Sequence, residues 1–156
     1  LLHSTDGTVI PYIHRYRAGG INSVRGYLPF SLGPFVRGSG FQSEGSATFE
    51  GSGDPIAPDD MLLVGGTQTW VNNLEVEWSP LAQIPLSGVV FFDAGNAFGD
   101  PWGEGNLSLS GLRTSYGVGL RMRSPMGLLR LEYGIPINPL PHEPRSNVEF
   151  TVGISF

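Results

Sequence analysis

Residues 147–156 read N-V-E-F-T-V-G-I-S-F, with apolar and polar side chains in strict alternation. In an extended strand, alternate side chains point to opposite faces. The apolar face comprises Val148, Phe150, Val152, Ile154 and Phe156, and the polar face comprises Asn147, Glu149, Thr151, Gly153 and Ser155. About ten residues is the length of a β-strand that crosses an outer membrane, with lipid on one side and a polar lumen on the other. The stretch therefore predicts a transmembrane β-strand.

The same alternation recurs in four earlier segments, residues 67–78, 86–98, 112–122 and 128–135. We expect the lipid face to include Trp70, Trp78, Val90, Phe92, Tyr116, Val118, Leu131 and Phe150. The charged residues of the strands fall on the other face: Glu75, Glu77, Asp93, Arg113, Arg121, Arg123, Arg130, Glu132 and Glu149. A cation at the lipid midplane costs about 2 to 4 kcal/mol, so this segregation favours a lumen, although a soluble β-sandwich would also segregate its charges.

Composition supports strands and excludes several functions. The chain of 156 residues has 23 Gly and 13 Pro, which disfavour long helices, and apolar runs such as residues 89–92 are too short for a membrane-spanning helix. All nine basic residues are Arg, and the net charge is −5, so we expect no binding to nucleic acid. There is no Cys and no initiator Met, and we interpret the chain as the carboxy-terminal piece of something longer.

The sequence divides into three parts. Residues 1–14 are expected to be the end of a preceding strand, residues 15–65 a long extracellular loop without regular structure, and residues 66–156 the last five transmembrane strands. Within the loop, residues 38–60 have the composition of a solvated segment, and residues 15–27 read R-Y-R-A-G-G-I-N-S-V-R-G-Y. Connections between the strands alternate long and short, as external loops and periplasmic turns do in outer-membrane barrels. The fold class that follows is all-β, the carboxy-terminal portion of an antiparallel transmembrane β-barrel.

No pattern of catalytic or metal-binding residues stands out. His3, His14 and His142 lack partners at metal-ligand spacing, and Asp54, Asp59 and Asp60 do not match a calcium loop. The sequence contains neither a nucleophile elbow nor a phosphate-binding loop. We therefore predict no catalytic residue, no metal and no cofactor.

One loop and three strand segments carry a family resemblance. Residues 19–27, G-G-I-N-S-V-R-G-Y, resemble the sixth-loop motif of the BamA family of outer-membrane barrel-assembly factors, whose core is V-R-G-F or V-R-G-Y. Residues 73–76 (N-L-E-V), 90–95 (V-F-F-D-A-G) and 124–127 (S-P-M-G) resemble, in order and spacing, the last strands of that barrel. The resemblance covers nearly the whole chain.

The resemblance implies that the loop is tucked into the barrel. The loop motif would comprise Gly19, Gly20, Val24, Arg25, Gly26 and Tyr27. Its arginine, Arg25, would pair with Asp93 and Glu75, with Phe91 beside them. Carboxylates in fork geometry are what a guanidinium inside a lumen requires.

The resemblance also implies a function, the assembly and insertion of β-barrel proteins into the bacterial outer membrane. The last strand would form one side of a lateral seam through Val148, Phe150, Val152, Gly153, Ile154 and Phe156. Expected partners are outer-membrane lipids, unfolded β-barrel substrates and, through upstream domains, accessory assembly lipoproteins. An isolated fragment is expected to be oligomeric. The alternatives are a related two-partner-secretion or autotransporter-assembly transporter, and an outer-membrane pore or enzyme.

Overall fold

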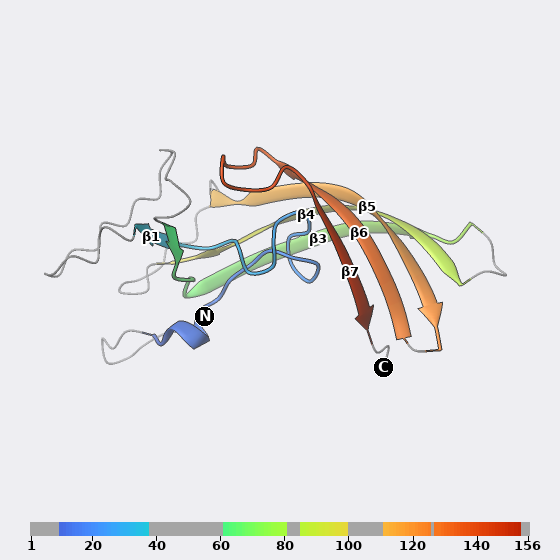
Figure 1. Cartoon of the computed structure of the whole chain (residues 1–156), viewed down its shortest axis with the longest axis horizontal. Helices are drawn as coiled ribbons and strands as arrows, with labels where there is room; N and C mark the ends of the chain where they lie inside the picture. Colours follow the sequence, from blue (N-terminus) through green and yellow to red (C-terminus); the bar gives the residue numbers. More distant parts are fainter. Residues whose placement is uncertain (1–9, 38–60, 81–84, 100–110, 126, 154–156) are drawn as a thin grey trace, which may run out of the picture.

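The computed structural model describes residues 10–37, 61–80, 85–99, 111–125 and 127–153. Its main element is a five-stranded antiparallel sheet of order β3-β4-β5-β6-β7 (Figure 1). The strands are β3 (Gln68–Trp78), β4 (Leu86–Phe98), β5 (Arg113–Ser124), β6 (Gly127–Ile137) and β7 (Asn147–Gly153). Each strand pairs with the next in sequence, so the predicted antiparallel all-β architecture is confirmed. No helix in the described ranges is long and apolar enough to span a membrane.

The observed strands follow the alternation of the sequence closely. The bounds of β4 coincide with the predicted ones. β5 begins one residue later and ends two residues later than expected, and β6 begins one residue earlier and ends two residues later. The register places Asp93 opposite Asn73 on one side and opposite Ser115 on the other. Residues that are directly opposite in an antiparallel pair share a face, so the polar sides of neighbouring strands merge into one surface.

The sheet therefore has two chemically different faces. Figure 1 shows it curving over the amino-terminal segment, drawn in blue, so that one face is concave. All eight residues predicted to face lipid are exposed: Trp70, Trp78, Val90, Phe92, Tyr116, Val118, Leu131 and Phe150. The buried residues of the sheet include Phe91, Asp93, Ser115 and Glu132, which belong to the opposite, polar set. An apolar outer face and a charged inner face are the pattern of a membrane barrel wall.

Residues 10–37 differ from the expected irregular loop. Ala18, Val24, Tyr27 and Leu32 form a small buried core, against which Val71 packs. Two short strands, β1 (Phe35–Arg37) and β2 (Met61–Leu63), pair with each other, although the sequence predicts no strand there. Residues 38–60, predicted to be solvated, lie outside the described ranges.

Two further expectations need correction. The described end of the first segment contains a 3-10 helix, η1 (Tyr12–His14), where the sequence predicts the end of a strand. Pro11 fits the amino-terminal boundary of this helix, because a proline lacks the N–H that a helix start leaves unpaired. Residues 1–9 are not described. In the alternation of residues 86–98, Phe98 falls on the same face as Val90 and Phe92, which predicts that it faces lipid. It is instead 7% exposed, and Gly111 lies against its ring.

Candidate functional site

The predicted loop motif lies in a compact turn structure that we call the docked loop, residues 16–32. Bridges between Tyr16 and Gly66 and between Ala18 and Leu32 define its base. Gly19 and Gly20 have φ of 102° and 91°, values that side chains rarely tolerate. A Cβ on Gly19 would also lie 2.4 Å from the carbonyl oxygen of Leu28. These two glycines therefore set the path of the loop.

The backbone of the docked loop touches the sheet where both partners lack a side chain. Gly26 has φ of 95°, and a Cβ there would lie 2.9 Å from the carbonyl carbon of Gly134 on β6. A Cβ on Gly134 would in turn lie 2.4 Å from the amide nitrogen of Gly26. The motif glycine thus has a matching glycine on the sheet, and the pair permits close approach of the two backbones.

Arg25 is the centre of the contact. Its Nε and Nη2 donate to the two carboxylate oxygens of Asp93, each at 2.7 Å, and its backbone N–H donates to Oδ2 at 3.0 Å. The side chains of Arg25 and Asp93 are 3% and 0% exposed. Burial acts to lower the pKa of the Arg25 guanidinium, but the hydrogen bonds and charge of Asp93, with the charge of Glu132, raise it above its ordinary value. The guanidinium is therefore charged in this position.

Other groups complete the surroundings of Arg25. Its Nη1 donates to Glu75 at 3.0 Å and to Glu132 at 3.3 Å. The guanidinium carbon lies 3.7 Å from the centroid of the Phe91 ring, a cation–π distance. The side-chain amide of Asn73 donates to the Ser23 carbonyl at 2.6 Å and to Asp93 at 2.7 Å. All three nitrogens of the Arg25 guanidinium thus donate to a carboxylate.

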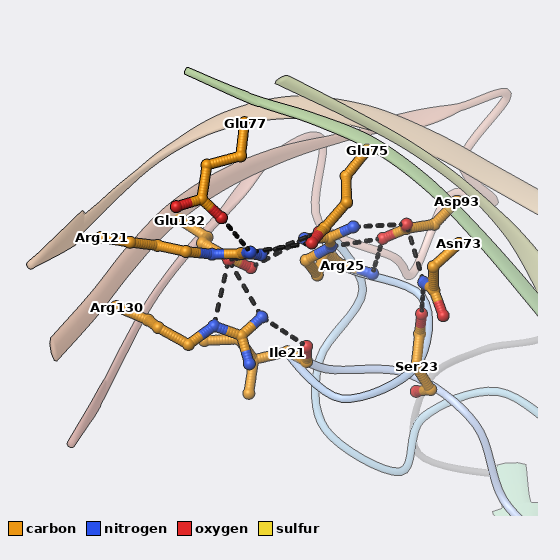
Figure 2. A network of polar contacts seen from close by, with 10 residues as sticks. All are labelled: Ile21, Ser23, Arg25, Asn73, Glu75, Glu77, Asp93, Arg121, Arg130 and Glu132. Carbon is orange, nitrogen blue, oxygen red and sulfur yellow. Dashed lines mark hydrogen bonds and ion pairs between the residues drawn. The ribbon is translucent and has the colours of Figure 1, made fainter. Parts of the chain in front are cut away.

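The ion pairs continue along the sheet as a closed ring, shown in Figure 2. Arg121 donates to both oxygens of Glu75 at 2.8 Å and to Glu132 at 3.1 Å. Arg25, Glu75, Arg121 and Glu132 therefore alternate in charge around the ring. Arg130 donates to Glu132 at 3.0 Å and to the carbonyl of Ile21 at 3.4 Å. Together these contacts join the loop to β3, β4, β5 and β6, and we call these four strands the wall.

The last residue of the motif contacts the sheet at the start of β5. The Tyr27 hydroxyl donates to the carbonyl of Thr114 at 3.2 Å, and the Arg113 guanidinium lies 5.4 Å from the ring centroid. Arg113 also forms an ion pair with Glu143. The side chain of Asn147 donates to the Tyr27 carbonyl at 3.5 Å. Within the described ranges, this is the hydrogen bond that joins the docked loop to β7.

The structure brings Arg25, Asp93, Glu75 and Phe91 together, as the resemblance implied. Arg121, Arg130, Glu132, Asn73 and Gly134 are additional members that the sequence reasoning did not assign to the loop. In the sequence, the only indication for these five residues was their position on the polar face of a strand. Val148, Phe150 and Val152 are exposed on the outer face of β7, Gly153 ends that strand, and Ile154 and Phe156 lie outside the described residues. No cluster of metal-ligating side chains occurs in the described part of the chain.

A curved sheet with an apolar outer face, a charged inner face and an arginine loop bound to that face defines the class of outer-membrane β-barrels with an internal loop. Comparison with known proteins agrees. The Omp85 superfamily domain matches residues 1–156, and the chain belongs to that superfamily. Its place is the bacterial outer membrane.

Two individual proteins make the likeness more specific. Over 129 residues the chain is 34% identical to the outer membrane protein assembly factor BamA of Nitratidesulfovibrio vulgaris, an alignment that covers 83% of this chain and 13% of the relative. The crystal structure of BamA from Haemophilus ducreyi lacking POTRA domains 1–3 has a TM-score of 0.63 at 23% identity, over 94% of this chain and 28% of that one. The second likeness concerns the fold. The chain thus spans a small part of both proteins.

Proposed function

We propose that the chain is the carboxy-terminal part of a barrel that assembles and inserts other β-barrel proteins in the outer membrane. Its partners would be membrane lipids and unfolded β-barrel proteins, with accessory lipoproteins bound through other domains of the full-length protein. The ion-pair ring would have a structural role, since its opposite charges neutralise one another. We propose no catalytic chemistry.

The observation that carries this proposal is that the docked loop is bound to the wall by several contacts and to β7 by few. The docked loop binds the wall through Arg25, Gly26 and Tyr27, whereas one hydrogen bond of 3.5 Å links it to β7 in the described ranges. The wall would stay rigid while β7, the last strand, pairs and unpairs at its other edge. An unpaired edge presents backbone N–H and C=O groups on which another strand can add by β-augmentation.

The proposal is tested with the full-length protein reconstituted in lipid vesicles. An unfolded outer-membrane barrel is added, and its insertion is followed by the appearance of protease-resistant substrate. We expect the protein to accelerate insertion about tenfold or more over empty vesicles, and Arg25→Ala to lose most of that acceleration because the loop is released. Arg145→Ala is the matched control, since Arg145 is exposed in the described structure and should leave the rate unchanged.

Two results would contradict the proposal. One is insertion at the rate of empty vesicles by a wild-type protein whose own barrel is intact, as judged by its heat-dependent electrophoretic migration. The other is accumulation of the substrate inside the vesicles without insertion, which would identify a transporter.

A further inference from the structure

Glu149 has an unusual position on the last strand. It lies in the middle of the described part of β7 and is partly buried on the polar face. Asn147, Thr151 and Gly153 share that face and carry no charge. Glu149 is therefore the one charged side chain that the described part of β7 directs to the lumen.

The nearest carboxylate on the neighbouring strand already has its counter-charges. Glu149 is directly opposite Glu132 in the β6–β7 register. Glu132 receives hydrogen bonds from Arg25, Arg121 and Arg130. Like charges directly opposite in a sheet destabilise the pair, and within the described residues no hydrogen bond or ion pair reaches Glu149. In this described part of the barrel no guanidinium group forms an ion pair with Glu149, because the nearby Arg25 and Arg130 are bonded to Glu132.

The ion-pair ring and the side chains bonded to it have more carboxylates than guanidinium groups. The ring and its neighbours contain the carboxylates Glu75, Glu77, Asp93 and Glu132 and the guanidinium groups of Arg25, Arg121 and Arg130. With Glu149, this network has five carboxylates and three guanidinium groups. Arg113, which is paired with Glu143, and the exposed Arg123 also belong to the inner face but have no ion pair to the network in the described residues. A further cation beside Glu149 would reduce this excess of negative charge.

The free edge of β7 is where such a cation can be supplied. The described sheet ends at β7, and a strand added there in antiparallel register would place one side chain directly beside Glu149 on the same face. We propose that Glu149 selects a basic side chain, Arg or Lys, on the incoming strand of an unfolded β-barrel protein. This inference rests on the proposed function and adds substrate selectivity to it.

The same register specifies the neighbours of the basic residue. Val148 and Phe150 point to the lipid side and are exposed, so the flanking residues of the incoming strand also point to lipid and should be apolar. The preferred strand therefore reads apolar, basic, apolar at the three positions opposite Phe150, Glu149 and Val148.

A capture experiment with the full-length protein tests the selection in a fixed register. Gly153 is replaced by Cys, because a Cβ there meets no atom closer than 3.8 Å and shares the face of Glu149. Synthetic strand peptides carry one Cys four positions before a variable residue that is Arg, Gln or Glu. In antiparallel register, disulfide formation at residue 153 places the variable residue opposite Glu149. The measured quantity is the initial yield of captured peptide.

We expect the Arg peptide to be captured about fivefold more than the Gln peptide, and the Glu peptide least. In the Glu149→Gln background the Arg and Gln yields should approach each other, and Glu149→Arg should reverse the order. The double change Glu149→Gln with Thr151→Glu is the matched control. This control protein has the same number of carboxylates on β7 as the Gly153→Cys protein. In it, the preference for Arg should move to the peptide position opposite residue 151, which is two residues nearer the Cys.

The possible outcomes separate this inference from the proposed function. Equal capture of all peptides by the Gly153→Cys protein, or an Arg preference that persists unchanged in Glu149→Gln, overturns the selectivity and leaves strand addition intact. Failure to capture any peptide by a protein with an intact barrel overturns both strand addition at β7 and the selectivity that depends on it.

Discussion

Replacing Asp93 with Ala removes the carboxylate that holds the docked loop. Asp93 is fully buried and accepts hydrogen bonds from the backbone and side chain of Arg25 and from Asn73. The loss of one partner from a buried ion pair costs about 3 to 5 kcal/mol, since the other charge remains desolvated. Arg25 would retain Glu75 at 3.0 Å and Glu132 at 3.3 Å, so we expect the lower end, about 3 kcal/mol.

That free energy can be measured as loop release. Trypsin cleaves after arginine, and Arg25 is 2% exposed in the docked loop, so cleavage requires the loop to leave the wall. When the loop returns faster than it is cut, the cleavage rate follows the population of released loop. A change of about 3 kcal/mol corresponds to about 150-fold faster cleavage. The full-length protein in vesicles is treated with trypsin, and mass spectrometry measures how fast the peptide bond between Arg25 and Gly26 is cleaved.

A matched variant shows whether burial is the cause. Glu77 also carries a carboxylate on the inner face, but its side chain is 39% exposed and contacts Arg121 at 3.3 Å. An exposed pair contributes about 0 to 1 kcal/mol, so Glu77→Gln should accelerate cleavage less than about fivefold. Equal cleavage of the Asp93→Ala and wild-type proteins, or an equally large effect of Glu77→Gln, would refute the reasoning.

Three further predictions concern the loop, the faces and the edges. Gly26→Ala should also release the loop, because its Cβ would lie 2.9 Å from Gly134 and its φ is 95°. If trypsin cleaved this variant after Arg25 no faster than it cleaves the wild-type protein, the result would contradict this contact. Spin labels at Val76 and Glu77 in the full-length protein should be accessible to dissolved oxygen and to a water-soluble nickel chelate, respectively, and the reverse result would show that the register of β3 is shifted by one residue. The isolated five-stranded fragment should associate in detergent, because each unpaired backbone group costs several kcal/mol in hydrocarbon; light scattering from a folded monomer would argue against two open edges.

The strands could be predicted because one of their faces meets lipid. The alternation predicts a strand over residues 86–98, and these are the observed bounds of β4, since alternation stops where the membrane face ends. The paired segments β1 and β2 contain three residues each and are 23 residues apart, too short to show a period. Phe98 has the right parity for lipid but packs under Gly111, a tertiary contact that alternation does not encode.

The site was predictable in part for a similar reason. The polar face identified Glu132 and Arg121 as inward-facing, and the resemblance supplied the contacts of Arg25 with Asp93 and Glu75. Which strands lie opposite the loop depends on sheet curvature, so the bond from Arg25 to Glu132, 107 positions away, could not be derived. The position of Gly134 on the polar face did not identify it as a contact of the loop either, because a glycine in a strand has several explanations.

The contacts of Arg121 with Glu75 and Glu132 have a kinetic consequence. Arg121 binds both oxygens of Glu75 and one oxygen of Glu132, and Arg130 binds Glu132 as well. None of these bonds involves Arg25, so two of its three carboxylate partners keep their orientation when the loop is absent. The binding surface is preorganised, and the cost of return is mainly the conformational entropy of the loop itself. Undocking should therefore be reversible and repeatable, with each return leading to the same arrangement.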